Sequence, residues 1–218
     1  MSNVRPLMLA IQNRDLAAAR TALERDASQA TEAIPGGISP LLFALYNGAK
    51  DIAELLRGFA EPSVFEAAAL DDGRRVAACL LADPGAIGSY SPDGWTPLHL
   101  AAFFGARNSL LVLIGMGAPL EAVSQNPMQN TPLHAGIAGA AGESLAPLLM
   151  ALGANPHHIG GSGITALHLA ASRGFEPLCR LLLTRGAERL AKTEDGKLAA
   201  DLARERGHLP TAAALELG

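Results

Sequence analysis

Six histidines are the residues of this chain best suited to acid–base or metal chemistry, because imidazole titrates near neutral pH and ligates metals. Three of them, His99, His134 and His168, each follow a Thr-Pro-Leu or Thr-Ala-Leu tripeptide. Their spacings of 35 and 34 residues indicate one position in a repeated unit. Four other copies of that position are predicted to hold Met8, Leu42, Phe65 and Asp201. The position therefore does not need imidazole for a shared reaction.

The adjacent pair His157-His158 differs because it lies in a glycine-rich stretch that is predicted to be a loop. Two histidines bind a divalent metal weakly, and no Cys, Asp or Glu stands beside them at ligand spacing. We predict a solvated loop and no metal site.

Other signatures of enzymes are missing from the sequence. The segment Gly160-Gly161-Ser162-Gly163 resembles a phosphate loop, but no strand precedes it and no lysine follows it. The carboxylate pair Asp71-Asp72 stands at a turn between two helices, where a solvated helix cap is expected. No nucleophile, base and orienting group can be assembled. We predict no catalytic residue, no cofactor and no enzymatic activity.

Composition limits the classes of partner. Hydrophobic residues make up 49% of the chain and aromatic ones 4%, so Ala, Leu and Val must build the core. The net charge of −4 offers no basic excess for phosphates, and no apolar run reaches the ~18 residues of a membrane span. We expect neither nucleic acid nor membrane as a partner. Cys79 and Cys179 are expected to be buried thiols, and with no signal core at the start a cytoplasmic location follows.

The elements that must position these residues are copies of one unit. Residues 95–102, 130–134 and 164–171 are its best copies, and worn copies begin near residues 5, 39, 62 and 195. In the best copy, Thr96 can cap a first helix with Pro97 in its first turn, and Gly105 can close it. A second helix, ending at Gly117-Ala118, completes the unit. Each unit needs its neighbours to bury its apolar face.

This pattern resembles the ankyrin-repeat family, whose unit of about 33 residues is a β-turn followed by two antiparallel helices. The resemblance implies an all-α solenoid of about seven helix-turn-helix units with short β-turn fingers, similar to stand-alone bacterial ankyrin proteins. It also implies that each histidine of the motif bonds the threonine of its own motif and backbone of the adjacent finger. The structural pairs would be Thr96 with His99, Thr131 with His134, and Thr165 with His168.

One irregularity interrupts the repeat. Only 23 residues separate Ser39 from Pro62, so one finger is missing between units two and three, with Glu61-Pro62 as the joint. We assign residues 1–60 to two degenerate units and residues 61–218 to five units that include a C-terminal cap. Two interpretations remain open: a continuous solenoid with one finger deleted, or a hinge that leaves the first two units semi-independent.

The resemblance implies that partners bind along the fingertips and the exposed side of the first helices. The matching positions that we select as partner-binding residues are Tyr46, Asn47, Leu70, Tyr90, Asp93, Trp95, Phe103, Phe104, Met128 and Arg173. The aromatic residues of this set fall in units two to four, and exposed aromatics are common at binding hot spots. Four of them are the expected anchors: Tyr46, Trp95, Phe103 and Phe104. Alternatively, some of these rings, Trp95 and Phe103 above all, pack against neighbouring helices.

The sequence thus predicts a non-catalytic protein–protein interaction module, monomeric by default, that holds another protein on its concave face and fingers. One form would be an inhibitor that occludes an enzyme. The alternative is a sensor that binds a small ligand or a metal in the groove or at the His157-His158 finger. A deep apolar pocket at the missing finger would favour the sensor.

Overall fold

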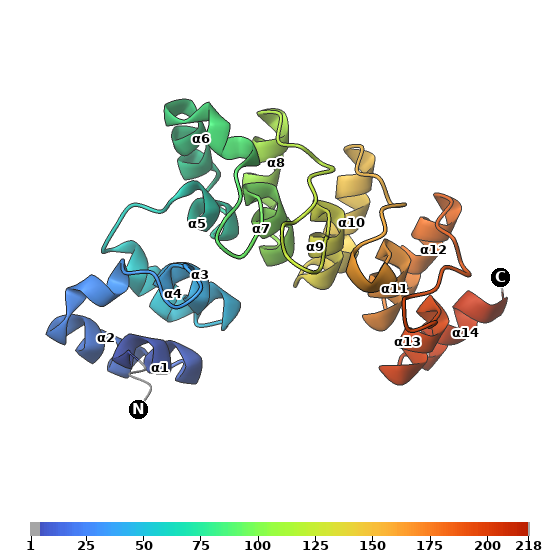
Figure 1. Cartoon of the computed structure of the whole chain (residues 1–218), viewed down its shortest axis with the longest axis horizontal. Coiled ribbons are helices and arrows are strands. Elements are labelled where there is room, and N and C mark those ends of the chain that lie inside the picture. The colour runs from blue at the N-terminus through green and yellow to red at the C-terminus, as the bar shows by residue number, and fades with distance from the viewer. Residues whose placement is uncertain (1–4, 218) are drawn as a thin grey trace.

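A computed structural model describes residues 5–217 of the chain. Within that range, fourteen α-helices form an arc of stacked helix pairs, and the only β-type pairing is an isolated bridge between Ile159 and Thr165 (Figure 1). Residues 1–4 of the first predicted unit and residue 218 of the last one lie outside the described range. None of the helices in the described part is long and apolar enough to cross a membrane.

Each helix pair joins a first helix to a second one through a short turn, and the two helices contact each other. The pairs are α1 (Pro6–Asn13) with α2 (Leu16–Arg25), α3 (Pro40–Tyr46) with α4 (Lys50–Arg57), α5 (Val64–Ala69) with α6 (Gly73–Ala82), α7 (Pro97–Phe104) with α8 (Arg107–Gly115), α9 (Pro132–Ala138) with α10 (Gly142–Ala151), α11 (Ala166–Ser172) with α12 (Glu176–Thr184), and α13 (Ala199–Glu205) with α14 (Leu209–Leu217). We number them as units one to seven.

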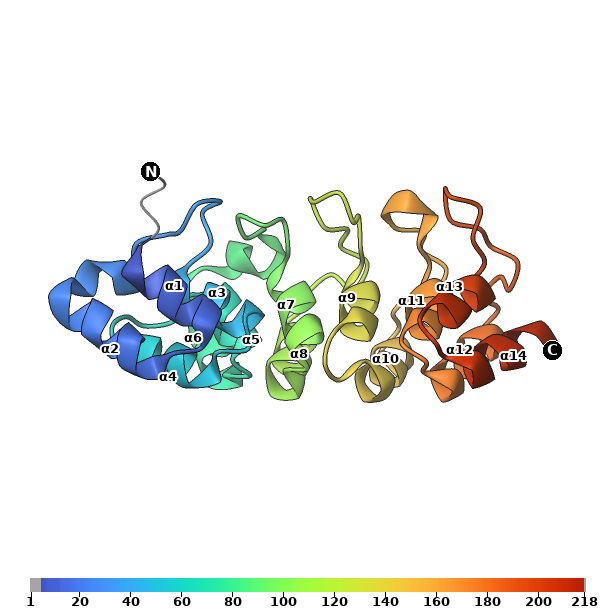
Figure 2. The ribbon, with the colours of Figure 1, turned by 90° about the horizontal axis from the view of Figure 1, so that it is seen from below.

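The pairs form two layers. From α5 onward, the first helices lie along the inner side of the arc and the second helices along its outer side (Figure 1). The loops between pairs project from one side as fingers (Figure 2). Three fingers contain a 3-10 turn: η1 (Ala27–Ala30), η2 (Pro84–Gly88) and η3 (Gly161–Gly163).

The start of α7 shows why the repeated motif forms a helix. The Thr96 side chain accepts a hydrogen bond from the His99 amide, and Pro97 occupies the first turn, where its missing N–H is not needed. Gly105 ends the helix with φ of 72°, a left-handed conformation that glycine adopts at little cost. In unit three the cap is Ser63, and its side chain exchanges hydrogen bonds with Glu66. Glu66 therefore occupies the motif's histidine position, and the prediction of Phe65 there is wrong by one residue.

Backbone hydrogen bonds join successive fingers. Within a finger, the N–H of one residue bonds a carbonyl across the turn, as Ser124 does with Asn130. The N–H of the following residue bonds a carbonyl of the preceding finger: Gln125 to Gly94 at 2.8 Å, Gly161 to Met128 at 2.7 Å, and Glu194 to Ser162 at 2.9 Å. The equivalent residue of the finger 83–96 is Pro92, which has no N–H. This finger lies directly against Gly37, where an added Cβ would approach the Pro92 side chain to 2.9 Å. The fingers of units two and four are thus neighbours without a backbone hydrogen bond at that position.

The missing finger has a direct structural counterpart. Only residues 58–63 connect α4 to α5, whereas full fingers precede α3 and α7. The hydrophobic core also divides here. One buried cluster lies mainly within α1 to α4, and a larger one runs from Leu42 and Val64 to the C-terminal pair. Contacts between α3 and α5 bridge the division. The continuous and the hinged interpretations therefore both remain compatible with the fold.

Candidate partner-binding surface

The motif histidines lie inside the stack. Nδ1 of His99 is 2.8 Å from Thr96 Oγ1, and its Nε2 is 2.8 Å from the Asn130 carbonyl in the next finger. His168 repeats both contacts, at 2.8 Å to Thr165 and 3.2 Å to the Lys197 carbonyl. Burial lowers the pKa of His99 to about 4, so the ring is neutral at pH 7, and both of its nitrogens are engaged in contacts within the stack.

His134 departs from this pattern. Its Nδ1 is 2.9 Å from Thr131 Oγ1, but its buried Nε2 has no hydrogen-bond partner among the described residues. The His158 ring packs edge-on beside it, with the centroids 5.4 Å apart, while His158 Nε2 contacts the Gln129 carbonyl at 2.8 Å. Burial and the neighbouring His158 lower the pKa of His134 to about 4. Within residues 5–217, no group of three or more His, Cys, Asp or Glu side chains is placed to hold a metal ion.

The aromatic residues of units two to four form one cluster. The Tyr46 ring lies 6.1 Å from Phe103 and 5.2 Å from Phe104, and Trp95 lies 5.4 Å from Phe103. Trp95 is only 6% exposed because its indole packs between His99 and Phe103. The expectation of Trp95 as an exposed anchor is therefore corrected, and the alternative, packing inside the stack, holds for it. Tyr46, Phe103 and Phe104 are half-buried.

The side chain of Tyr46 forms a hydrogen bond within the chain. Its hydroxyl donates a 2.6 Å hydrogen bond to Oδ2 of Asp93, which lies on the finger before α7. Burial and this carboxylate raise the pKa of Tyr46 well above its usual range. The bond spans from unit two to unit four, past the unit that lacks a finger. Both predicted site residues, Tyr46 and Asp93, thus hold neighbouring elements together.

Three further predicted residues also make contacts within the chain. Tyr90 donates to the Val123 carbonyl of the next finger at 3.0 Å, and the Asn47 carbonyl accepts from Arg14 Nε at 2.8 Å. Arg173 donates to the Ala138 carbonyl at 2.7 Å, at the end of the preceding unit's first helix. These three residues are exposed or half-buried, yet each of them forms a hydrogen bond with a neighbouring unit.

Leu70, Phe103, Phe104 and Met128 are the predicted residues for which apolar exposure remains. Leu70 and Phe104 line one hollow of about 310 Å³ between α4 and the ends of α3, α5 and α7, together with Leu45. Phe103 packs edge-on against Phe104, with centroids 5.2 Å apart. Met128 is 48% exposed and lies on a finger of another unit. The structure therefore brings Leu70, Phe103 and Phe104 together and leaves Met128 apart from them.

The two most exposed apolar side chains of the fingers were not among the selected partner-binding residues. Ile159, 63% exposed, and Leu190, 74% exposed, lie on the fingers before α11 and α13. Their signal in the sequence is an apolar residue within a predicted finger. Aromatic residues outweighed that signal.

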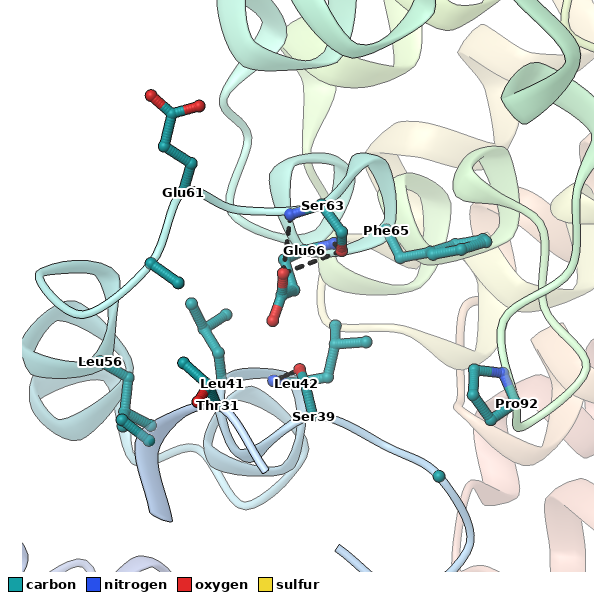
Figure 3. A pocket seen from close by; sticks show the side chains of 13 residues that line it. Thr31, Ser39, Leu41, Leu42, Leu56, Glu61, Ser63, Phe65, Glu66 and Pro92 are labelled. Carbon is teal, nitrogen blue, oxygen red and sulfur yellow. Dashed lines mark hydrogen bonds between the residues drawn. The ribbon is translucent and has the colours of Figure 1, made fainter. Parts of the chain in front are cut away.

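A pocket of about 280 Å³ lies at the missing finger (Figure 3). Its walls come from α3, from the joint and α5, and from the two fingers that meet above it. The residues that line it include Leu41, Leu42, Ser63, Phe65, Glu66 and Pro92. The sequence predicted the missing finger but not the form of this space.

Parts of this chain are similar in sequence to known proteins. The family model described as ankyrin repeat matches residues 93–125 and 162–194. The chain is 34% identical over 96 residues to the B-cell lymphoma 3 protein homolog of Mus musculus, which covers 44% of this chain and 21% of that protein. It is 34% identical over 115 residues to the probable E3 ubiquitin-protein ligase XBOS34 of Oryza sativa subsp. japonica, or 52% and 22% of the two chains.

A shorter match gives 42% identity over 55 residues with protein phosphatase 1 regulatory subunit 27 of Homo sapiens, 25% of this chain and 36% of that one. The matched regions are about a fifth to a third of these relatives' lengths. The three spaced motifs, the stacked helix pairs and the two family-model matches agree with one another. The chain contains ankyrin repeats, and its stacked helix pairs form an ankyrin-repeat solenoid.

Proposed function

We propose that this chain is a non-catalytic protein–protein interaction module that binds its partner on the inner side of the arc and along the fingers. One observation carries the proposal: Leu70 and Phe104, at the ends of α5 and α7, line an open hollow together with Leu45, Ala53 and Ala69. Apolar side chains grouped in a concave site are typical of binding hot spots, and the charged residues Lys50, Glu54 and Asp71 that also line this hollow can add polar contacts to a partner. The proposal includes a cytoplasmic, monomeric protein that binds no nucleic acid.

The relatives support a binding role. One is named as a regulatory subunit of protein phosphatase 1, and a regulatory subunit acts by contact with another protein. Another is named as a probable ubiquitin-protein ligase, but the match covers 22% of that protein, so its activity is not carried over to this chain. The motif histidines are neutral and bonded to the scaffold, which also favours a module without catalysis.

Affinity capture from host lysate, read by mass spectrometry, tests this surface. The double variant Leu70→Ala, Phe104→Ala should lose the captured partner while its circular dichroism stays unchanged. Leu81→Ala with Leu111→Ala is the matched control, because these leucines are exposed on the second helices α6 and α8. Full capture by the first pair, or loss of capture by the control pair alone, would contradict the proposed surface.

The alternative function, a sensor of a small ligand, is favoured by the pocket at the missing finger. The thermal midpoint of the chain with and without small metabolites would test it. The other proposed sensor site has less support, because His158 already bonds the Gln129 carbonyl.

A further inference from the structure

The pocket at the missing finger exists because two fingers close over a unit that has none. The finger 83–96 reaches Gly37 through Pro92 and forms the far wall. Leu41 and Leu42 of α3 and Phe65 of α5 supply apolar side chains to the pocket's lining (Figure 3). A volume of about 280 Å³ is slightly below the ~300–1,000 Å³ of sites for drug-sized ligands. It suits one long side chain.

The charge that faces the pocket is negative. Glu61 and Glu66 are the charged residues among its lining, and no Lys, Arg or His contributes to it. Arg75 forms an ion pair with Glu61 and so compensates that carboxylate. Glu66 is half-buried and forms no ion pair with any residue in the range 5–217.

Glu66 is also fixed in orientation. Its Oε2 accepts hydrogen bonds from the Ser63 amide at 2.7 Å and from the Ser63 hydroxyl at 2.8 Å. The other carboxylate oxygen has no hydrogen bond within the described residues, and Figure 3 shows the carboxylate extending toward Leu41 and Leu42. The second oxygen is therefore available to a donor from a partner, and a charged donor would form the stronger, charge-assisted bond with it.

We propose that this pocket receives one arginine or lysine side chain of the bound protein partner. The aliphatic stem would pack on Leu41, Leu42 and Phe65, and the cationic end would bond Glu66. Long basic side chains combine these two properties, and arginine adds a planar donor group that matches a carboxylate. An anionic or phosphorylated segment is disfavoured by the Glu66 carboxylate, which has no ion-pair partner in the range 5–217. The inference rests on the proposed function, since it names a chemical property of the partner.

A peptide selection tests the proposal without knowledge of the partner. A library of random linear peptides displayed on phage is selected on the full chain and, in parallel, on Glu66→Gln. Glutamine keeps the oxygen that accepts from the Ser63 amide, so the helix cap survives while the charge is lost. Glu143→Gln is the matched control, since Glu143 is exposed in the first turn of α10.

The wild-type chain and the control should enrich peptides that carry a basic residue at a fixed position. For such a peptide, Glu66→Gln should lower the affinity about tenfold or more, which corresponds to about 1.4 kcal/mol. Replacing the basic residue of the peptide by leucine should cause a similar loss that does not add to the first. Peptides without a basic residue, or unchanged affinity for Glu66→Gln, would overturn the proposal.

Two further outcomes separate the possible failures. If partner capture needs Leu70 and Phe104 but is unaffected by Glu66→Gln, the binding surface stands and the side-chain pocket falls. If N-acetyl-arginine amide raises the thermal midpoint in a Glu66-dependent way while no basic peptide is selected, the occupant is a free cationic ligand. That result would overturn the assignment to a protein partner.

Discussion

Units four to seven are held together in one way, and units two, three and four, around the missing finger, in another. In the regular stack, successive fingers are joined by a backbone hydrogen bond, and the buried His99 and His168 link their motifs to the next finger. At the joint, a proline replaces the donor, the core divides, and side-chain contacts such as Tyr46–Asp93 and Arg57–Asp72 bridge the units. A regular repeat forms backbone contacts between its units, whereas units on either side of a break are held by contacts between individual side chains.

The difference between the two regions indicates where a hinge would lie. We propose that residues 5–57 are the part of the solenoid most easily separated from the rest, because fewer backbone contacts hold them. Four experiments can break or sharpen that difference.

Acidification should have the largest effect, and it should act on the regular stack. Burial lowers the pKa of both His99 and His134 to about 4, below the ~6.5 of an unfolded chain. Their stabilisation is fully present above pH 6.5 and is lost as the pH falls from 6.5 toward 4, by about 3 kcal/mol for each histidine. Urea unfolding followed by Trp95 fluorescence at pH 7 and pH 4.5 measures this loss.

The first two units are the internal control for that experiment. They contain no histidine, and their motif positions hold Met8 and Leu42. Hydrogen exchange in residues 5–57, corrected for intrinsic rates, should show no histidine-linked change over the same pH range. A stack whose stability is constant from pH 7 to 4.5 would show that the imidazoles are not buried as described.

The second experiment tests close backbone packing within the regular stack. A Cβ on Gly139 would lie 2.0 Å from the Phe103 carbonyl oxygen, so Gly139→Ala should cost roughly 3 kcal/mol or more. At Gly115, where nothing lies within 4 Å, alanine should instead stabilise α8 by about 0.5 kcal/mol. Chemical denaturation of both variants compares them, and equal stabilities would contradict the tight contact between units four and five.

The third experiment compares helix caps. Thr96→Ala removes both the cap of α7 and the partner of the His99 ring, for an expected cost of about 2 kcal/mol. Ser39→Ala removes the cap of α3, where Leu42 stands in place of histidine, for about 1 kcal/mol. If Ser39→Ala costs as much as Thr96→Ala in denaturant melts, the histidine adds nothing to the cap.

The smallest expected effect is at the joint. Tyr46→Phe removes the bond to Asp93 and keeps the ring, for about 1 kcal/mol. Hydrogen exchange should rise mainly in residues 5–57. Tyr90→Phe is the matched change, because its bond to the Val123 carbonyl lies where the backbone ladder also holds the fingers. Equal, local effects of the two variants would argue against a hinge.

Much of this architecture could be predicted from spacing alone. The threonine and histidine positions of the best copies, the glycine that ends α7 and the missing finger all follow from residues at fixed intervals. Unit three was predicted one residue out of register because Ser63 and Glu66 replace the threonine and histidine.

The candidate surface could be predicted less well, for a geometric reason. Position in the repeat indicates which side a residue faces, but not which neighbour lies within bonding distance. Tyr46 and Arg173 were selected for exposure and proved to contact other units, and Trp95 proved to be buried. The pocket depends on how far two fingers close over a short unit, which local sequence does not specify.

Pro92 also limits how this solenoid can be re-engineered. A finger grafted between α4 and α5 to complete unit three would accept no backbone hydrogen bond from Pro92, since that residue has no N–H. The graft would stay unpaired on one edge, and an unpaired edge invites association with other chains. Restoring a full repeat therefore requires two changes together, the insertion and a residue with an amide hydrogen at position 92.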